Sequence, residues 1–354
     1  MNILMIACGS LSVAFQEYKI ALEFAKKGHV VYLICNKPNS HFEVGKLEKH
    51  ENLKTIEIPH SSYKYDLLDI NDKIDVCLGM DQSVSPFVAE YQERRKVPGY
   101  CMFLDMPIHA IDGRDLDNYN SKYSQSYYYW INCALSLTGV IFNNSVAVDE
   151  FKKRYKRDAH LVFYSVTQDD ALSSFEAPPT KDYVFGCNRI IPYKRVDLAV
   201  EAIIKTPYDY KHVFISGDKS EMDKINDLAP EADNKFVFYQ GVSEDKKMEF
   251  FYNAKLVVYT QMVKWIGGLS ILEGMSVKTP GVCFDYPALR ELYGDCALYA
   301  EPGNVDQLSK AITDLYEDDD LNADVAERGY ARFQQYFTRE VMADNLLEVI
   351  KNGK

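Results

Sequence analysis

Residues 1–35 read MNILMIACGSLSVAFQEYKIALEFAKKGHVVYLIC, and this stretch decides the fold class. Ile3–Cys8 is an apolar run that predicts a strand, and Gly9-Ser10 predicts a turn after it. Apolar residues then recur every three or four positions, which predicts a helix that ends at Gly28. The run HVVYLIC predicts the next strand. Strand, helix and strand in so short a stretch form a βαβ unit, and this unit requires a parallel sheet.

The alternation of short apolar runs and amphipathic stretches continues along the chain. In the first half the predicted strands are Leu53–Ile58, Asp75–Leu78, Gly99–Leu104, Gly139–Phe142 and His160–Tyr164. In the second half they are Tyr183–Cys187, His212–Ser216, Phe236–Tyr239, Leu256–Tyr259 and Gly281–Phe284. The predicted helices of that half include Asp197–Lys205, with Asp197 as N-cap, Leu269–Val277 and Arg339–Ile350.

A chain of 354 residues is long for a single core, because domains usually contain about 100–200 residues. The stretch Glu176–Thr180 interrupts the pattern and predicts a linker there or a few residues earlier. We therefore expect a Rossmann-like N-terminal domain over 1–170, a second over 171–335, and a C-terminal helix over 336–354 that can pack back on the first domain. Two doubly wound α/β domains face each other across a cleft, and such clefts bind ligands.

The composition is that of a soluble globular protein, with 47% hydrophobic and 26% charged residues. The net charge of −12 argues against nucleic acid as a partner, because proteins that grip its backbone carry a basic surplus. The eight cysteines never approach C-x-x-C spacing, so we expect free thiols rather than disulfides or a zinc site. No apolar run approaches ~18 residues, and no basic signal region precedes the first strand, so the predicted location is the cytoplasm.

The most informative local stretch is GCNRIIPYKRVDLAVEAI, residues 186–203. It places Arg189 and Lys194 in the loop after a predicted strand, at the sheet edge where open α/β sheets bind ligands. Arginine offers a planar fork of donors and lysine a mobile charge, and together they suit a phosphate group. An exposed basic loop without a ligand is the alternative.

A second stretch, KWIGGLSILEGMSVKTPG, covers residues 264–281. Gly267 and Gly268 come directly before a predicted helix, so backbone N–H groups at its positive end can approach a ligand closely. Glu273 lies about one turn inside this helix, where it can accept a hydrogen bond from a ligand hydroxyl. A glycine-rich turn followed by a solvated glutamate is the alternative interpretation.

These motifs resemble the family-4 retaining glycosyltransferases of the GT-B fold, known as glycosyl transferases group 1. The resemblance extends over most of the chain. It begins with the opening βαβ unit and rests mainly on RIIPYKR and GLSILEGM. Further matching pieces are Ile215-Ser-Gly217-Asp, Phe238-Tyr-Gln-Gly241-Val-Ser and Glu291-Leu-Tyr-Gly-Asp295.

The resemblance implies transfer of a hexose, with mannose as one candidate, from a nucleotide diphosphate sugar to a glycan or glycolipid acceptor. It further implies retention at the anomeric carbon and no metal or other cofactor. Arg189 and Lys194 match the pair that holds the donor diphosphate, and Glu273 matches the ribose ligand. The other donor-binding positions that it implies are Gly9, Ser10, Gly217, Val242, Gly267, Gly268 and Leu269.

Two positions depart from the family pattern. Trp265 stands where the first glutamate of E-x7-E is expected, and an indole cannot accept hydrogen bonds from sugar hydroxyls. Many relatives carry a histidine directly after the strand that ends here at Leu104, whereas this chain has Asp105, with His109 four residues later. Asp105 could act as a carboxylate base towards an acceptor hydroxyl, and His109 could reach the cleft. A purely structural role is the alternative for each.

Other functions stay open at this point. Trp265 is compatible with a non-catalytic protein that binds nucleotide sugars, and GT-B-type nucleotide-sugar epimerases share the architecture. The basic cluster Lys152–Arg157 predicts a solvated helix end, with weak peripheral contact to an anionic membrane as the alternative. The Asp-x-Asp pair Asp115-Leu-Asp117 lies in a polar loop, so we expect a solvated turn there and no metal site.

Overall fold

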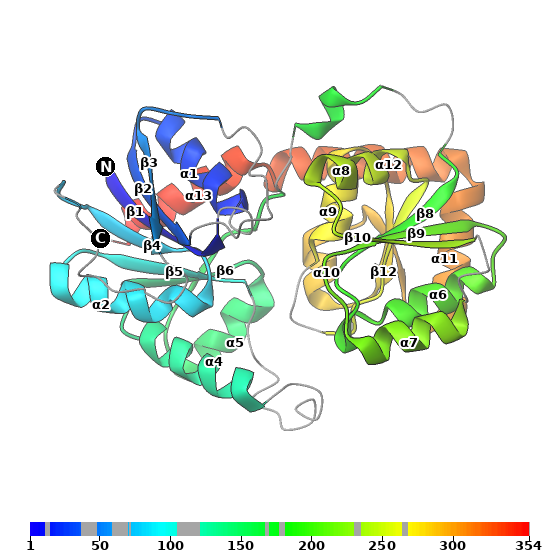
Figure 1. Ribbon diagram of the computed structural model, residues 1–354, viewed down its shortest axis with the longest axis horizontal. Coiled ribbons are helices and arrows are strands. Elements are labelled where there is room, and N and C mark those ends of the chain that lie inside the picture. Colours follow the sequence, from blue (N-terminus) through cyan, green and yellow to red (C-terminus); the bar gives the residue numbers. More distant parts are fainter. Residues whose placement is uncertain are drawn as a thin grey trace. The chain divides into compact units, whose positions relative to one another are not determined.

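The computed structural model describes residues 1–10, 15–36, 48–58, 70, 72–104, 121–166, 170–176, 181–229, 235–263 and 268–353 (Figure 1). The chain divides into two compact units. Unit 1 consists of Met1–Thr167 and Arg339–Lys354, and unit 2 consists of Gln168–Thr338. The chain thus crosses between the units twice, a few residues from the positions 170/171 and 335/336 at which we placed the domain boundaries.

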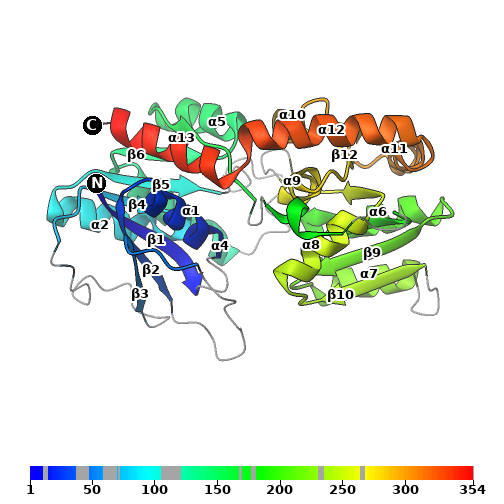
Figure 2. The same ribbon diagram turned by 90° about the horizontal axis from the view of Figure 1, so that it is seen from above.

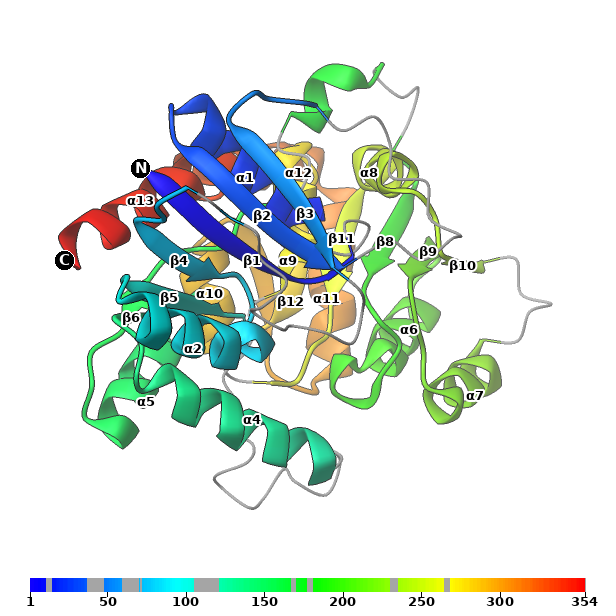
Figure 3. The same ribbon diagram turned by 60° about the vertical axis from the view of Figure 1, so that its left-hand side comes forward.

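Unit 1 is built on a parallel sheet whose described strands run in the order β3-β2-β1-β4-β5-β6-β7. Figure 3 shows this order from β3 to β6. The strands are β1 (Asn2–Ser10), β2 (Val30–Asn36), β3 (Leu53–Ile58), β4 (Val76–Gly79), β5 (Gly99–Phe103), β6 (Gly139–Phe142) and β7 (His160–Leu161). The helices are α1 (Phe15–Lys26), α2 (Ser85–Arg95), α4 (Ser121–Ala134), α5 (Ser145–Tyr155) and α13 (Arg339–Asn352). The order reverses between β1 and β4, as in a doubly wound fold.

The predicted turn at Gly9-Ser10 is wrong, because β1 continues through Ser10, which pairs with Asn36 after a shift in register. Pairing with β2 therefore overrides the local preference of glycine for a turn. The end of α1 is as expected. Gly28 has φ +83°, and the N–H groups of Gly28 and His29 donate to the carbonyls of Ala25 and Phe24, which is a Schellman cap.

The C-terminal helix α13 packs beside α1 in unit 1 (Figure 2). Met342, Leu346 and Ile350 are fully buried in the same apolar core as the strands of unit 1. At the edge of this contact the Lys27 ammonium lies 2.8 Å from the Asp344 carboxylate. The end of the chain therefore completes the core that its first residues begin.

Unit 2 is built on a second parallel sheet, with its described strands in the order β10-β9-β8-β11-β12-β13. The strands are β8 (Tyr183–Cys187), β9 (Asp209–Phe214), β10 (Phe236–Gln240), β11 (Leu256–Tyr259), β12 (Gly281–Phe284) and β13 (Ala297–Ala300). The helices are α6 (Val196–Ile204), α7 (Lys219–Leu228), α8 (Glu244–Asn253), α9 (Leu269–Ser276), α10 (Pro287–Tyr293), α11 (Val305–Glu317) and α12 (Asp319–Tyr336). The order reverses between β8 and β11.

Helix α9 packs closely on the sheet of unit 2, and Gly274 makes this approach possible. A Cβ atom at Gly274 would lie 2.9 Å from both the Thr279 carbonyl oxygen and Val257 Cγ2. On its other side α9 contacts α12, where a Cβ at Gly329 would lie 3.1 Å from Met275 Cγ. Close packing on both sides fixes the position of α9 and of its N-terminus.

The described cysteines other than Cys8 are free, and most of them are buried. None of the helices in the described ranges has both the length and the apolar character that crossing a bilayer requires. Within the same ranges, no group of three or more His, Cys, Asp or Glu side chains is arranged to hold a metal ion.

Glu17 is a buried carboxyl group near the start of α1, with its side chain inside unit 1. The Tyr164 hydroxyl donates to its Oε1 at 3.3 Å, and its Oε2 has no partner among the described residues. Burial raises the pKa of Glu17 from 4.5 to about 7, and the nearby Asp81 carboxylate contributes in the same direction.

Glu17→Gln is therefore expected to stabilise the protein above pH 7, by on the order of 1 kcal/mol. The pKa of Glu17 is higher in the folded state than its ordinary value of 4.5, so the protonated side chain stabilises the folded state fully below pH 4.5. This contribution to the free energy of unfolding is lost as the pH rises through about 7. Glutamine keeps an oxygen for Tyr164 and does not ionise. Thermal unfolding of both proteins from pH 5 to pH 8.5 measures the difference, and identical pH profiles would contradict the assignment.

Candidate functional site

The candidate site lies at the carboxyl edge of the sheet of unit 2, beside the point where the strand order reverses. Here β8 ends at Cys187 and the chain passes through residues 188–195 into α6. In open α/β sheets ligands bind at such an edge, because the loops after neighbouring strands diverge there. The predicted cations Arg189 and Lys194 both belong to this loop.

The start of the loop is fixed by backbone contacts with the loop after β9. The Ile190 N–H donates to the Ser216 carbonyl at 3.0 Å, and the Asp218 N–H donates to the Ile190 carbonyl at 2.7 Å. Gly217 lies between these partners, and a Cβ there would come within 3.2 Å of Ile190 Cβ. Gly217, one of the predicted donor-binding positions, therefore lies against the Arg189 loop.

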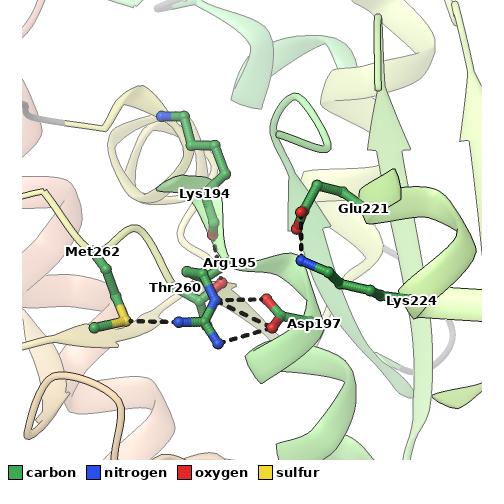
Figure 4. A network of polar contacts seen from close by, with 7 residues as sticks. All are labelled: Lys194, Arg195, Asp197, Glu221, Lys224, Thr260 and Met262. Atoms are coloured by element: carbon green, nitrogen blue, oxygen red, sulfur yellow. Dashed lines mark hydrogen bonds and ion pairs between the residues drawn. The ribbon is translucent and has the colours of Figure 1, made fainter. Parts of the chain in front are cut away.

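The end of the loop is fixed by residues that follow β11. The Met262 N–H donates to the Tyr193 carbonyl at 3.0 Å, and the Thr260 hydroxyl donates to the Lys194 carbonyl at 3.0 Å (Figure 4). The Ser270 hydroxyl, in the first turn of α9, bonds the Cys187 carbonyl. The two stretches that the sequence singled out are thus joined directly.

The Lys194 ammonium is oriented by two buried neutral groups. Its Nζ donates to the Tyr259 hydroxyl at 2.8 Å and to Gln261 Oε1 at 2.6 Å. Tyr259 in turn donates to Gln261 at 2.6 Å. Both of these partners are uncharged, so these two hydrogen bonds hold the ammonium in place without themselves cancelling its charge. Sequence reasoning missed both residues, although the position of Tyr259 at the end of β11 and of Gln261 just after it is a signal that could have found them.

Arg189 is held more loosely than Lys194. Its Nη2 donates to the Tyr193 hydroxyl at 3.0 Å, and in the described part of the chain no carboxylate lies within ion-pair distance of its guanidinium. Within the described ranges, the Arg189 guanidinium is therefore not neutralised by a neighbouring acid. Such a group is suited to an anionic ligand.

The next cation, Arg195, has a structural role. Its guanidinium forms a two-pronged ion pair with Asp197, with Nε 3.0 Å from Oδ1 and Nη2 2.9 Å from Oδ2 (Figure 4). The predicted N-cap Asp197 is wrong: the capping position of α6 is Arg195 itself, with φ 47°, and Asp197 lies in the first turn. The local ion pair draws the carboxylate away from the backbone N–H groups that a cap would bind.

Gly268 occupies the N-cap of α9 and lies against Tyr259, the tyrosine that holds Lys194. A Cβ at Gly268 would come within 2.3 Å of Tyr259 Cζ, so only glycine fits without displacing the ring. The Tyr293 hydroxyl donates to the Gly268 carbonyl at 2.5 Å, and Leu269 is partly exposed beside it. The N-terminus of α9 therefore lies close to the Lys194 side chain.

Glu273 is buried in α9 and forms an ion pair with Lys247 of α8, 2.7 Å from its Oε1. Lys247 also contacts Glu244 at 2.7 Å. Burial alone would lower the pKa of Lys247, but the carboxylates of Glu273 and Glu244 outweigh it and raise that pKa. Val242, another predicted donor-binding residue, follows β10 a few residues before Lys247. Sequence reasoning did not identify the Lys247–Glu273 pair.

The remaining predicted site residues belong to other parts of the chain. Gly9 and Ser10 form the end of β1 in unit 1. Asp105, His109, Gly267 and Trp265 lie outside the described residues. Their roles stay predictions.

The basic cluster Lys152–Arg157 lies at the end of α5. Most of its side chains form ion pairs or hydrogen bonds within unit 1. Lys152 is 2.6 Å from Asp158, and Lys153 and Arg154 both pair with Glu150. The Arg157 guanidinium donates to backbone carbonyls, including that of Ala134 at 3.0 Å. Much of the positive charge of the cluster is therefore balanced by its neighbours.

Comparison with known proteins points in the same direction as this geometry. Residues 168–332 match the family described as "Glycosyl transferases group 1". The chain is 33% identical over 102 residues to O-antigen chain mannosyltransferase B of Escherichia coli, a match that covers 28% of this chain and 26% of the relative. It is 24% identical over 181 residues to the lipopolysaccharide core biosynthesis glycosyltransferase LpsE of Rhizobium meliloti (strain 1021), covering 50% of this chain and 52% of that relative. The matches thus span about a quarter of the length of the first curated relative and about half of the length of the second.

Among solved structures, Anabaena HepE in complex with UDP and glucose aligns over 99% of this chain and 100% of its own. The TM-score is 0.73 and the identity 16%, a level at which the likeness shows the fold alone. The two parallel α/β units agree with that fold. Residues 168–332 are therefore a glycosyl transferases group 1 domain, in a chain with the GT-B fold.

Proposed function

We propose that this protein is a retaining, metal-independent glycosyltransferase that moves a hexose from a nucleotide diphosphate sugar to a glycan or glycolipid acceptor. One observation carries the proposal. The loop after β8 presents the Arg189 guanidinium and an oriented Lys194 ammonium beside the N-terminus of α9. The name of the mannosyltransferase relative and the UDP and glucose bound to HepE support a hexose donor.

The proposed chemistry uses these groups to stabilise the leaving group. Transfer breaks the bond between the anomeric carbon and the diphosphate oxygen, so negative charge develops on the departing nucleotide diphosphate. Arg189 and Lys194 supply charged donors to it, and the first N–H groups of α9 add the positive end of a helix dipole. Loss of one such fixed donor typically costs about 3–4 kcal/mol of transition-state stabilisation.

The rest of the proposed donor site follows from the loops around this pair. Gly217, Gly268 and Leu269 would approach the phosphates and the sugar, and Val242 would contact the base through its backbone. Glu273 would accept a hydrogen bond from a ribose hydroxyl. On the acceptor side the proposal assigns Asp105 as a carboxylate base and His109 as a second candidate.

We place the proposed reaction in the cytoplasm and assign to Lys152–Arg157 at most a weak contact with an anionic membrane. Each cation near such a surface contributes about 1 kcal/mol. The ion pairs of Lys152 with Asp158 and of Arg154 with Glu150 compete with that attraction.

A panel of UDP-, GDP- and ADP-sugars tests the proposal. A bound donor at a hundredfold excess over its Kd is expected to stabilise the protein by about 2.7 kcal/mol, which thermal unfolding detects readily. The stabilising donor should then release its nucleotide slowly, and the release should depend on Arg189. Tight binding without any turnover would favour a non-catalytic nucleotide-sugar-binding protein, to which Trp265 also points. Conversion of the donor sugar without transfer would favour an epimerase.

Glu273→Gln is expected to lower the preference for ribonucleotides over 2′-deoxyribonucleotides, because a neutral amide oxygen is a weaker acceptor than a carboxylate. A carboxylate that accepts from a ribose hydroxyl contributes about 1.5–3 kcal/mol, so the wild-type protein should bind the ribonucleotide at least tenfold more tightly. Calorimetric titration with both forms of the preferred nucleoside diphosphate measures the ratio. Glu244→Gln is the matched control, because Glu244 also contacts Lys247 but is half-exposed on α8. A ratio unchanged in Glu273→Gln would contradict the ribose assignment.

A further inference from the structure

Beneath the Arg189 loop, β9 places two buried polar side chains against β8. Tyr210 and His212 lie two residues apart on β9, and His212 is in register with Gly186 of β8. A Cβ at Gly186 would lie 2.2 Å from the Tyr210 hydroxyl oxygen and 2.4 Å from His212 Nδ1. Gly186 therefore leaves the space that both side chains occupy.

These side chains form a chain of hydrogen bonds that ends on the backbone of the loop. The Tyr210 hydroxyl lies 2.8 Å from His212 Nδ1, and His212 Nε2 lies 3.1 Å from the Asn188 carbonyl oxygen. A carbonyl can only accept, so Nε2 carries the proton, and the neutral ring then accepts from Tyr210 at Nδ1. Complete burial lowers the pKa of His212 to about 4, so the ring is neutral near pH 7.

The bonded carbonyl belongs to the peptide group that joins Asn188 to Arg189. Its hydrogen bond fixes the plane of that peptide and hence the direction in which the Arg189 side chain leaves the backbone. We infer that His212 is a positioning residue, held in one tautomer by Tyr210, which aims Arg189 at the β-phosphate of a nucleoside diphosphate. The inference rests on the proposed function, because it takes this loop to be the diphosphate site.

The preference for a nucleoside diphosphate over the corresponding monophosphate measures this role. Calorimetric titrations with UDP and UMP, and with GDP and GMP, give the ratio of affinities for each protein. A substitution that only disturbed the local structure would weaken the binding of the diphosphate and of the monophosphate alike, and would leave the ratio of their affinities unchanged. His212→Leu keeps the approximate size but removes the donor to Asn188, and is expected to lower the ratio about tenfold.

Two further substitutions of His212 distinguish the effect of its hydrogen bond to the Asn188 carbonyl from the effect of the volume of its ring. The amide nitrogen of His212→Gln can reach the place of Nε2, so this variant should keep the ratio within about twofold of wild type. The shorter His212→Asn can still bond Tyr210 but does not reach Asn188, and should resemble His212→Leu. It also serves in place of the leucine variant if that variant does not unfold cooperatively.

Arg189→Ala in the same titrations distinguishes failure of this inference from failure of the proposed function. If Arg189→Ala and Lys194→Ala both leave the ratio unchanged, the loop is not the diphosphate site and the proposed function fails with it. If Arg189→Ala lowers the ratio while His212→Leu and His212→Asn preserve it, the diphosphate site stands and the positioning role of His212 is overturned. A fall in the ratio for both His212 variants, with rescue by His212→Gln, supports the inference.

Discussion

Replacing Arg189 or Lys194 by alanine is expected to weaken binding of the donor's nucleoside diphosphate by about 10- to 100-fold for each change. Hydrogen bonds to charged groups contribute about 1.5–3 kcal/mol, which corresponds to such factors. Lys194→Ala should have the larger effect, because Tyr259 and Gln261 already hold its ammonium in place and little ordering remains on binding. Isothermal titration calorimetry with UDP, GDP and ADP measures the affinities.

The matched control is Lys205→Ala, which removes the same charge at the opposite end of α6. Lys205 is exposed and pairs with Asp306, far along the helix from the loop that contains Lys194. Its replacement should leave the affinity within about twofold, since exposed ion pairs contribute little. Unchanged affinity in both Arg189→Ala and Lys194→Ala would refute the phosphate assignment.

Gly268→Ala is expected to destabilise the protein by about 1–3 kcal/mol and to weaken nucleotide binding at the same time. The new methyl group would lie 2.3 Å from Tyr259 Cζ, and this ring is buried and carries the hydroxyl that bonds Lys194. Either the ring or the start of α9 must move, and each movement disturbs the Lys194 ammonium. Denaturant unfolding gives the stability, and calorimetry with the preferred nucleotide gives the affinity.

A double-mutant cycle with Tyr259→Ala isolates this contact. Removal of the ring makes room for the methyl group, so the two stability costs should sum to more than the cost of the double variant. Nucleotide binding should stay weak in the double variant, because Lys194 then lacks its tyrosine partner. Strict additivity of the two stability changes would show that the methyl group does not press on Tyr259.

Much of the fold could be predicted from the sequence, because strands buried on both faces are near-continuous apolar runs. For this reason the predicted bounds of β6, β8, β11 and β12, which are almost fully buried, agree with the structure. The predicted strands His160–Tyr164 and His212–Ser216 differ in their bounds from β7 and β9. Two other errors occur where tertiary contacts override a local signal. At Gly9-Ser10, pairing with β2 extends a strand through a predicted turn, and at Asp197 an ion pair replaces a cap.

The site could be predicted only in part. Arg189 and Lys194 were identifiable because both follow a strand end within one short motif. Their partners Tyr259, Gln261 and His212 come from β9 and from the end of β11, on either side of β8. Nothing in the linear sequence places those strands beside β8. The residues that orient the two cations can therefore be identified only once the strand order is known.

A crystal structure of the protein with an intact nucleotide sugar tests the central claim most directly. We expect oxygens of the diphosphate within about 2.7–3.2 Å of the Arg189 guanidinium and the Lys194 ammonium, facing the first turn of α9. A diphosphate bound elsewhere, with Arg189 and Lys194 both left in contact with solvent or protein only, would contradict the account.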